Sequence, residues 1–320
     1  MENIKVFKNL GIPSRRKSWL KKREGLLTSS EVAAAFDQSP FLTPLELYAR
    51  KAGLVDEGFE ENSRMKAGRM LEPAVAAWVA EEMGVKARPF RDFYADTENR
   101  LGASFDWEIP EMEGKEGRGI LEIKCVDYLV FNGSFKEGYT DRKWHPIEGS
   151  DDVRAPVYIE LQVQLQMLLT GRSWAVIGVL VGGSDLKILH RTANPVIQQK
   201  IVAQAQKFWA MVDAKQQPEA DFARDFETLK RLYAVPDPRE TIADDDAGKA
   251  MKAIAVASDA SERKRQAEAE EKEAKARLMA ILGEAEQAIL PDGSKVTWKA
   301  DKRGRRIMRL TPAMQMDEAA

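Results

Sequence analysis

The chain has 320 residues, 44% hydrophobic and 31% charged, with a formal net charge of −2 at neutral pH. This length leaves room for a large core domain with an appendage, and the composition is typical of a globular protein. The near-neutral charge argues against a protein that coats nucleic acid indiscriminately, and a single cysteine excludes an internal disulfide.

The sequence also limits the compartment and the kind of metal site. It has no apolar run of about 18 residues that could span a membrane, and Met1–Lys5 does not open an apolar segment of signal-peptide type. We therefore expect a cytoplasmic protein with no membrane partner. Only His145 and His190 accompany Cys125, so a Cys/His zinc site is not expected and oxygen atoms should hold any metal.

Three helices are predicted in the first quarter of the chain. The segment Thr28–Glu31 is typical of a helix start, with hydroxyls able to cap the first turn, and Thr43-Pro44 opens a second helix. A third runs from about Ser63 to Met83. Glu72 lies inside it, before a proline, and is either a surface carboxylate near a kink or a third acid brought over a sheet.

Strands are predicted next, at about 88–95, 101–108 and 119–126, and the Gly-rich Glu113–Gly119 reads as a hairpin turn between the last two. Asp106 and Glu122 then lie on neighbouring strands. The two-residue period of a strand places Glu122 and Lys124 on the same face of the sheet.

Two acids and a lysine that face one point suit a hard, oxygen-ligated cation such as Mg²⁺. The carboxylates of Asp106 and Glu122 and the main-chain carbonyl of Ile123 would hold the metal. Lys124 would orient or deprotonate a water, or stabilise charge on a phosphate. Glu-x-Lys is also common as a weak ion pair on a solvated strand, so this hypothesis depends on partners elsewhere in the chain.

The segment 127–152 is predicted to be long and irregular, as lids and binding loops often are. A helix follows from Val157 to Leu169, and Gln164 would project toward the site if this helix packs on the strand ends. Two strands, Trp174–Val181 and Leu186–Arg191, form a hairpin, and a last core helix begins at Asn194.

The character of the chain changes after about residue 235, which suggests domains at 1–235 and 236–320. A charge-dense helix is predicted over Asp244–Leu282, without the sustained apolar heptads of a coiled coil, and a small β-meander follows it. This extension could bind a partner or another subunit, or serve only for solubility.

Basic residues gather at Arg15–Arg23, around a tryptophan, and again at Lys302–Arg309. Such clusters are compatible with a phosphate-binding groove and equally with ordinary solvated surface.

The order of these motifs resembles that of the lambda-type exonucleases, or YqaJ viral recombinase family, in the PD-(D/E)xK nuclease superfamily. The order runs from the basic Trp segment through Thr-Ser-Ser-Glu, Gly-x-x-x-Glu-Pro, Ser-x-Asp and Glu-x-Lys-Cys to Gln-x-Gln on a helix. The resemblance covers about residues 15–215. It implies an α/β fold with a restriction-endonuclease-like core, in which helices flank a mixed central sheet, while the charged helix and β-meander lie outside it.

The resemblance also implies roles for individual residues. The catalytic positions are Asp106, Glu122, Lys124, Glu72 and, on the later helix, Gln164. The substrate-binding positions are Ser104 near the scissile phosphate, Arg23 and Ser30 at a 5′-phosphate, and Gln162. Phe105 replaces the proline that the family has before the aspartate, and Trp107 replaces a glycine often found after it.

The function implied is that of a Mg²⁺-dependent deoxyribonuclease, with Mn²⁺ as a substitute, that hydrolyses linear double-stranded DNA from 5′ to 3′. The family suggests a ring-shaped homotrimer that supplies single strands to an annealing protein in phage-type recombination, encoded by a phage or prophage in a bacterial host. Two alternatives stay open: a RecB-like or single-strand-specific nuclease, and a non-catalytic DNA-binding or assembly protein on a nuclease fold. Cys125 is expected to be a small buried residue and His145 to be structural.

Overall fold

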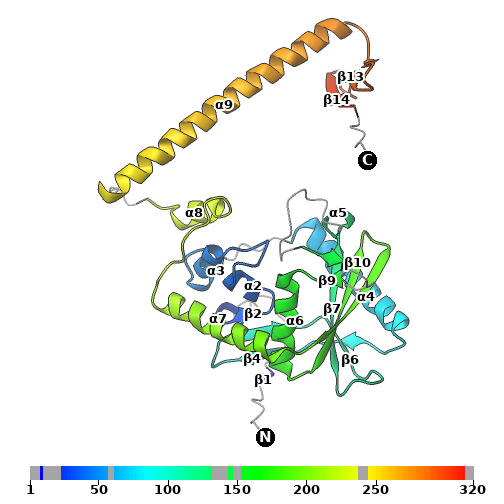
Figure 1. The fold of residues 1–320 in the computed structure, drawn as a ribbon, viewed down its shortest axis with the longest axis vertical. Coiled ribbons are helices and arrows are strands. Elements are labelled where there is room, and N and C mark those ends of the chain that lie inside the picture. The colour runs from blue at the N-terminus through cyan, green and yellow to red at the C-terminus, as the bar shows by residue number, and fades with distance from the viewer. Residues whose placement is uncertain are drawn as a thin grey trace, which may run out of the picture. The chain divides into compact units, whose positions relative to one another are not determined.

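The computed structural model describes residues 8–9, 23–56, 61–131, 143–146, 153–236 and 244–313. It separates the chain into two units, Met1–Val235 and Pro236–Ala320 (Figure 1). The basic segment between Arg15 and Lys22, and most of the irregular segment predicted over 127–152, lie outside the described residues.

Two mixed sheets form the first unit. The larger has five strands, in the order β11 (Asp185–Thr192), β10 (Trp174–Val181), β7 (Gly119–Val126), β6 (Trp107–Ile109) and β3 (Arg88–Pro89). Its β7–β10 pair is parallel and its other pairs are antiparallel. The smaller sheet has the order β1 (Lys8–Asn9), β4 (Phe93–Asp96), β5 (Leu101–Ser104) and β2 (Leu27–Thr28), and β8 (His145–Pro146) pairs with β9 (Val153–Arg154).

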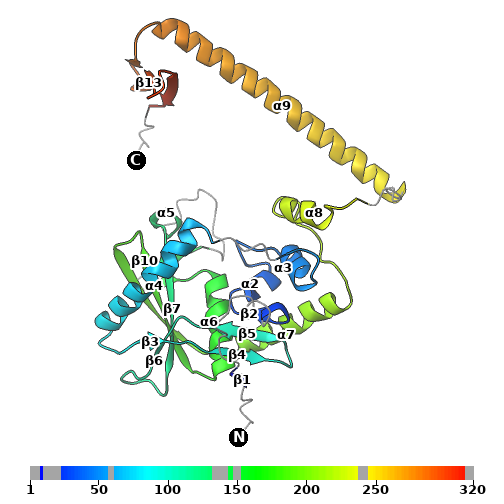
Figure 2. The same ribbon diagram turned by 180° about the vertical axis from the view of Figure 1, so that it is seen from behind.

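Helices cover both faces of the five-stranded sheet (Figure 1). On one face, Val75 and Val79 of α4 (Ser63–Glu82) pack against Leu121 of β7. The other face is covered by α6 (Val157–Thr170), which lies between this sheet and the β4–β5 strands, and Figure 2 shows the same arrangement from behind. Within the described residues, the unit also contains α2 (Val32–Ala35), α3 (Pro44–Lys51), α5 (Tyr128–Phe131), α7 (Pro195–Asp213) and α8 (Phe226–Leu232).

Burial along β7 and β10 follows from this two-sided cover. All eight residues of β10 are buried, as expected for a strand with helices on both faces. In β7, burial extends from Gly119 to Ile123, and then Lys124 is half-buried and Cys125 exposed. The expectation that Cys125 is buried was therefore wrong, because the strand leaves the apolar layer before it ends.

Most predicted elements are confirmed, including the helix around Glu72, which contains Pro73, and the β10–β11 hairpin. Two predicted strands are divided, however. The segment 88–95 forms β3 and β4, and the segment 101–108 forms β5 and β6, in different sheets. The chain passes between the sheets at Phe105, whose buried ring stacks on that of Phe90 at a centroid distance of 4.3 Å.

The helix start at Thr28–Glu31 also differs from its prediction. The short α2 has Glu31 as its N-cap residue and no side-chain cap. Instead the Glu31 carboxylate accepts hydrogen bonds from the amide (3.0 Å) and the hydroxyl (2.6 Å) of Thr28. The hydroxyl of Thr28 is thus a donor to the acid and does not cap the helix.

The second unit has the predicted helix and meander. It consists of α9 (Asp244–Leu282) and an antiparallel sheet of β12 (Gln287–Ile289), β13 (Lys295–Ala300) and β14 (Arg306–Thr311). Ion pairs four residues apart, such as Arg277–Glu273 at 2.5 Å, occur along α9 and stabilise an exposed helix. No helix in the described part of the chain combines the length and apolar character required to cross a membrane.

Substitution of Gly119, at the start of β7, tests the packing of the central sheet. A Cβ at Gly119 would lie 2.2 Å from a ring carbon of the buried Trp174. We expect Gly119→Ala to lower the free energy of unfolding by about 2 kcal/mol through overpacking, measured by urea denaturation. Gly68→Ala in α4, where a Cβ meets nothing within 4 Å, should be neutral or slightly stabilising. Equal effects of the two substitutions would contradict this account.

Candidate active site

Glu122 is the most buried charged residue of the predicted site, with its side chain 1% exposed. Three donors surround its carboxylate. Oε1 accepts from the Lys124 ammonium and from the Gln162 amide, each at 2.5 Å, and Oε2 accepts from the Gln166 amide at 2.7 Å. Lys124 comes from the same face of β7 and the glutamines from α6, so strand and helix together satisfy both oxygens.

Asp106 lies opposite Glu122, at the point where the chain passes between the two sheets. The register Trp107↔Leu121 of the β6–β7 pair places it there, and its Oδ2 accepts from the Ile123 amide at 3.0 Å. Burial and then the negative charge of Glu122 raise the pKa of Asp106 well above its ordinary value, although the Lys124 charge acts in the opposite direction.

Lys124 is the cation between these acids. Its Nζ contacts Glu122 Oε1 and also donates to Gln162 Oε1 at 3.3 Å. Burial lowers the pKa of Lys124, but the charges of Glu122 and Asp106 outweigh burial, and the pKa is raised. The ammonium is therefore charged at neutral pH.

Glu72 approaches from α4, on the other side of the sheet. Its Oε1 accepts from the indole N–H of Trp107 at 3.1 Å. Burial raises the pKa of Glu72, the Trp107 hydrogen bond lowers it, and the charge of Glu122 raises it again. Glu72 is thus within electrostatic reach of Glu122, and its hydrogen bond with Trp107 orients it.

These oxygen atoms fit a hard divalent cation. The donors are carboxylates, and the pKa of Asp106 is raised by burial and then by repulsion from Glu122, which a cation would relieve. Within the described residues no group of three or more His, Cys, Asp or Glu side chains is already clustered as a metal site. The fit therefore depends on Asp106 and Glu122, and on the Ile123 carbonyl predicted beside them.

The glutamines of α6 correct one expectation. Gln164 does not face the site: its amide donates to the Thr192 carbonyl at 2.9 Å, and its Oε1 accepts from the Asn194 amide at 2.9 Å. Side chains two apart on a helix are about 200° apart, whereas those at i and i+4 share a face. Gln162 therefore shares its face with Gln166, and not with Gln164.

Gln166 was missed by the sequence reasoning. Its side chain is fully buried, and its amide donates to Ser104 O at 3.1 Å as well as to Glu122. Its Oε1 has no hydrogen-bond partner among the described residues. The i, i+4 spacing from Gln162 was the signal that could have found it.

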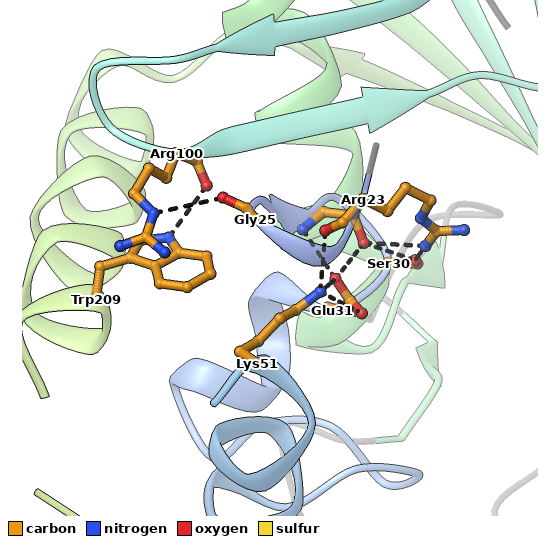
Figure 3. A network of polar contacts seen from close by, with 8 residues as sticks. Arg23, Gly25, Ser30, Glu31, Lys51, Arg100 and Trp209 are labelled. Carbon is orange, nitrogen blue, oxygen red and sulfur yellow. Dashed lines mark hydrogen bonds and ion pairs between the residues drawn. The ribbon is translucent and has the colours of Figure 1, made fainter. Parts of the chain in front are cut away.

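The predicted phosphate-binding pair lies together in a second polar cluster (Figure 3). Arg23 Nη2 donates to Thr28 Oγ1 at 3.1 Å and to Ser30 Oγ at 3.3 Å. The parallel register of β2 and β5, in which Thr28 is opposite Gly102, places this cluster at the same end of the strands as Ser104 and Asp106.

A buried ion pair lies beneath Arg23. Lys51, with a side chain 1% exposed, contacts the Glu31 carboxylate at 2.9 Å and donates to the Arg23 carbonyl at 3.4 Å (Figure 3). Burial opposes the ionisation of Glu31, but the charges of Lys51 and Arg23 and the Thr28 hydroxyl hold its pKa below the ordinary value. The pair ties α2 and α3 to the segment that carries Arg23.

Comparison with known proteins finds one family model that matches part of this unit. Residues 18–173 match the model of the YqaJ-like viral recombinase domain. A search of curated proteins gave no match.

Several solved structures are similar in part. The alkaline exonuclease LHK-Exo from Laribacter hongkongensis, solved in complex with dAMP, is 21% identical, with a TM-score of 0.45 over 68% of this chain and 98% of its own. A phage-related exonuclease from Haemophilus somnus is 13% identical, with a TM-score of 0.35 over 64% of this chain and 91% of its own. A putative exonuclease from Eubacterium rectale is 11% identical, with a TM-score of 0.40 over 74% of this chain and all of its own.

The buried pair beneath Arg23 can be tested by its pH dependence. Lys51→Met leaves Glu31 buried without its cation, and we expect a loss of about 3 kcal/mol of unfolding free energy at pH 7. Because the folded pKa of Glu31 is lowered, this stabilisation is present above its ordinary pKa and is lost as pH falls through the folded value. The difference between wild type and variant should therefore shrink below about pH 4.

The matched control for this measurement is Lys187→Met, which breaks the exposed pair with Asp185 and should cost less than about 1 kcal/mol. Denaturant unfolding of all three proteins at several pH values gives the comparison. A Lys51→Met effect that is small, or that grows in acid, would show that the pair does not stabilise the fold.

Proposed function

Because residues 18–173 form a YqaJ-like viral recombinase domain, we propose that this chain is a metal-dependent DNA exonuclease that acts on linear double-stranded DNA from the 5′ end in phage-type recombination. The core is then of the PD-(D/E)xK type, with Asp106, Glu122 and Lys124 as the motif that gives the superfamily its name. The observation that carries the proposal is the convergence of these three side chains, with Lys124 Nζ 2.5 Å from Glu122 and Asp106 opposite.

In this proposal each residue has a chemical task. Asp106, Glu122 and the Ile123 carbonyl hold Mg²⁺, or Mn²⁺ in its place, and Glu72 completes the acidic set. When bound, such an ion supplies a Lewis acid for the phosphate and lowers the pKa of a water. Lys124 donates from Nζ to that water or to a phosphoryl oxygen on which charge develops. Gln162 and Gln166 keep the Glu122 carboxylate in one orientation, as donors to metal-ligating carboxylates commonly do.

The Arg23 cluster is proposed as the site for the terminal 5′-phosphate. An arginine with adjacent hydroxyls supplies a charge and several donors to phosphate oxygens. Ser104 lies at the end of β5, between this cluster and Asp106, where a hydroxyl would meet the scissile phosphate. By the same family reasoning the enzyme forms a homotrimer and supplies single strands to an annealing protein.

The decisive measurement is the digestion of linear duplex DNA with and without a 5′-phosphate, in Mg²⁺ and in EDTA. We expect metal-dependent digestion that prefers the phosphorylated end. Lys124→Ala should lower its rate by about 10²–10⁴-fold, because the donor to the water or phosphate is lost. Lys187→Ala on β11 is the matched control and should keep wild-type activity. No digestion by folded wild-type protein would overturn the proposal and favour a non-catalytic DNA-binding role.

The glutamines of α6 give a second test of the site. Gln166→Leu removes a donor to Glu122 and should lower the rate, or raise the Mg²⁺ concentration needed, by about 10–100-fold. Gln164→Leu instead removes the contacts with Thr192 and Asn194, and should cost about 1–3 kcal/mol of stability with activity per folded molecule unchanged. Mg²⁺ titrations of activity and denaturant unfolding separate the two effects, and the reverse pattern would refute this assignment.

A further inference from the structure

The meander of the second unit has two unlike faces. In antiparallel pairing, residues opposite each other point to the same side of the sheet. The registers Val296↔Leu310 and Trp298↔Met308 define one side, which contains the unit's buried Val296. We call the other side the basic face. Its residues are Gln287, Ile289, Lys295, Thr297, Lys299, Ile307, Arg309 and Thr311.

The first side packs on the end of α9. Arg306 lies over the Trp298 ring at 3.6 Å and donates to the carbonyls of Gly283 and Ala285, just after that helix. Leu282, the last residue of α9, is buried. The meander is therefore oriented on its own helix with the basic face on the outside. Arg306 contributes to this orientation through its contacts with Trp298, Gly283 and Ala285.

Three cations lie on the basic face. Lys295, Lys299 and Arg309 are all exposed, and each lysine is a diagonal neighbour of Arg309, at about 7–8 Å. Along β13 the two lysines are about 13 Å apart at the rise of a strand. No acidic residue shares this face, and the other side chains between the cations are hydroxyls, an amide and two isoleucines.

These charges are almost uncompensated. Lys295 and Arg309 form no ion pair within the described residues, and Lys299 has only Glu286 at 3.9 Å. At the β13–β14 turn, the exposed Lys302 and Arg303 add two further cations. The carboxylate of that turn, Asp301, is already engaged by the Arg305 guanidinium at 2.9 Å and by backbone amides, so it does not offset them.

The positive charge of the meander also contrasts with that of α9. Along α9, lysines and arginines pair with acids one turn away, as in Arg263–Asp259 and Lys275–Glu271. Such pairing offsets most of the positive charge of the helix, although Lys252 and Lys272 have no ion pair within the described residues. The basic face and its adjoining turn, in contrast, bring four cations without an ion pair within the described residues onto one small sheet: Lys295, Lys302, Arg303 and Arg309.

We propose that the basic face, with Lys302 and Arg303 at its edge, binds the phosphate backbone of DNA at a site separate from the nuclease centre. Charge complementarity selects a polyanion, since hydroxyls and cations on a flat sheet can contact successive phosphates. Contacts to phosphates carry no direct sequence information, so we expect binding that is independent of sequence. The face contains no aromatic residue on which an unpaired base could stack, so a preference for single strands is not expected. The choice of DNA as the polyanion rests on the proposed function. The positive charge of the basic face is observed independently of that function.

The test uses the full chain and fluorescence anisotropy of a labelled duplex in EDTA, over a range of salt concentrations. The variant carries Lys295→Gln, Lys299→Gln and Arg309→Gln. We expect weaker binding and a slope of log affinity against log salt that is shallower by about 2–3, one unit for each lost phosphate contact. Two duplexes of different sequence should behave alike.

Two controls make the result specific. Arg263→Gln, Lys275→Gln and Arg277→Gln remove the same charge from α9 and should leave the slope near that of wild type. Lys295→Arg and Lys299→Arg keep the charge and should retain wild-type binding, which separates loss of charge from misfolding.

If the Gln variant keeps the wild-type slope of log affinity against log salt, the inference is overturned. This is the result expected if the face binds an acidic protein in place of DNA. Because binding is measured without metal, this outcome is independent of digestion. A failure of the nuclease proposal would appear only as absent hydrolysis by the wild type.

Discussion

Burying the carboxylate of Glu122 costs several kcal/mol unless its charge is compensated, and the site is built around that compensation. Lys124 supplies the countercharge from the same strand, and Gln162 and Gln166 supply neutral donors from α6. The helix must therefore lie on the β7 face at one rotation, because only one pair of side chains, one turn apart, can meet the acid. The geometry of the proposed site and the packing of the core are in this way the same constraint.

The second constraint is the passage of the chain between two sheets beside Asp106. Phe105 anchors the passage in a cluster with Phe90 and Tyr94, and the Asp106 carbonyl accepts from the Phe90 amide at 3.1 Å. At the next position, Trp107 reaches the carboxylate of Glu72. Phe105 and Trp107 thus hold the chain on either side of Asp106, the first by aromatic packing and the second by its hydrogen bond to Glu72.

How much of the fold and of the site could be predicted from the sequence depended on how far apart in the chain the interacting residues lie. Alternation along one strand placed Glu122 and Lys124 together, and a Gly-rich turn paired that strand with the one after Asp106. The division of 101–108 between two sheets was not predictable, because local periodicity contains no information on which sheet a strand joins. Gln164 was the position that the family resemblance implied. Periodicity could not correct it, because the apolar residues of α6 occupy a wide arc and do not define which polar side chain faces inward.

The parallel pairing of β7 with β10 has a consequence for biogenesis. The connection between these strands runs through α5, β8, β9 and α6, so both acids are synthesised well before the helix whose glutamines donate to Glu122. Long-range pairing of this kind forms slowly, because the entropy of loop closure must be lost before the stabilising contacts form. A nascent chain that ends before α6 therefore contains Asp106 and Glu122 but cannot bury them together. The buried arrangement of Glu122 therefore forms only after α6 has been synthesised and has packed on β7.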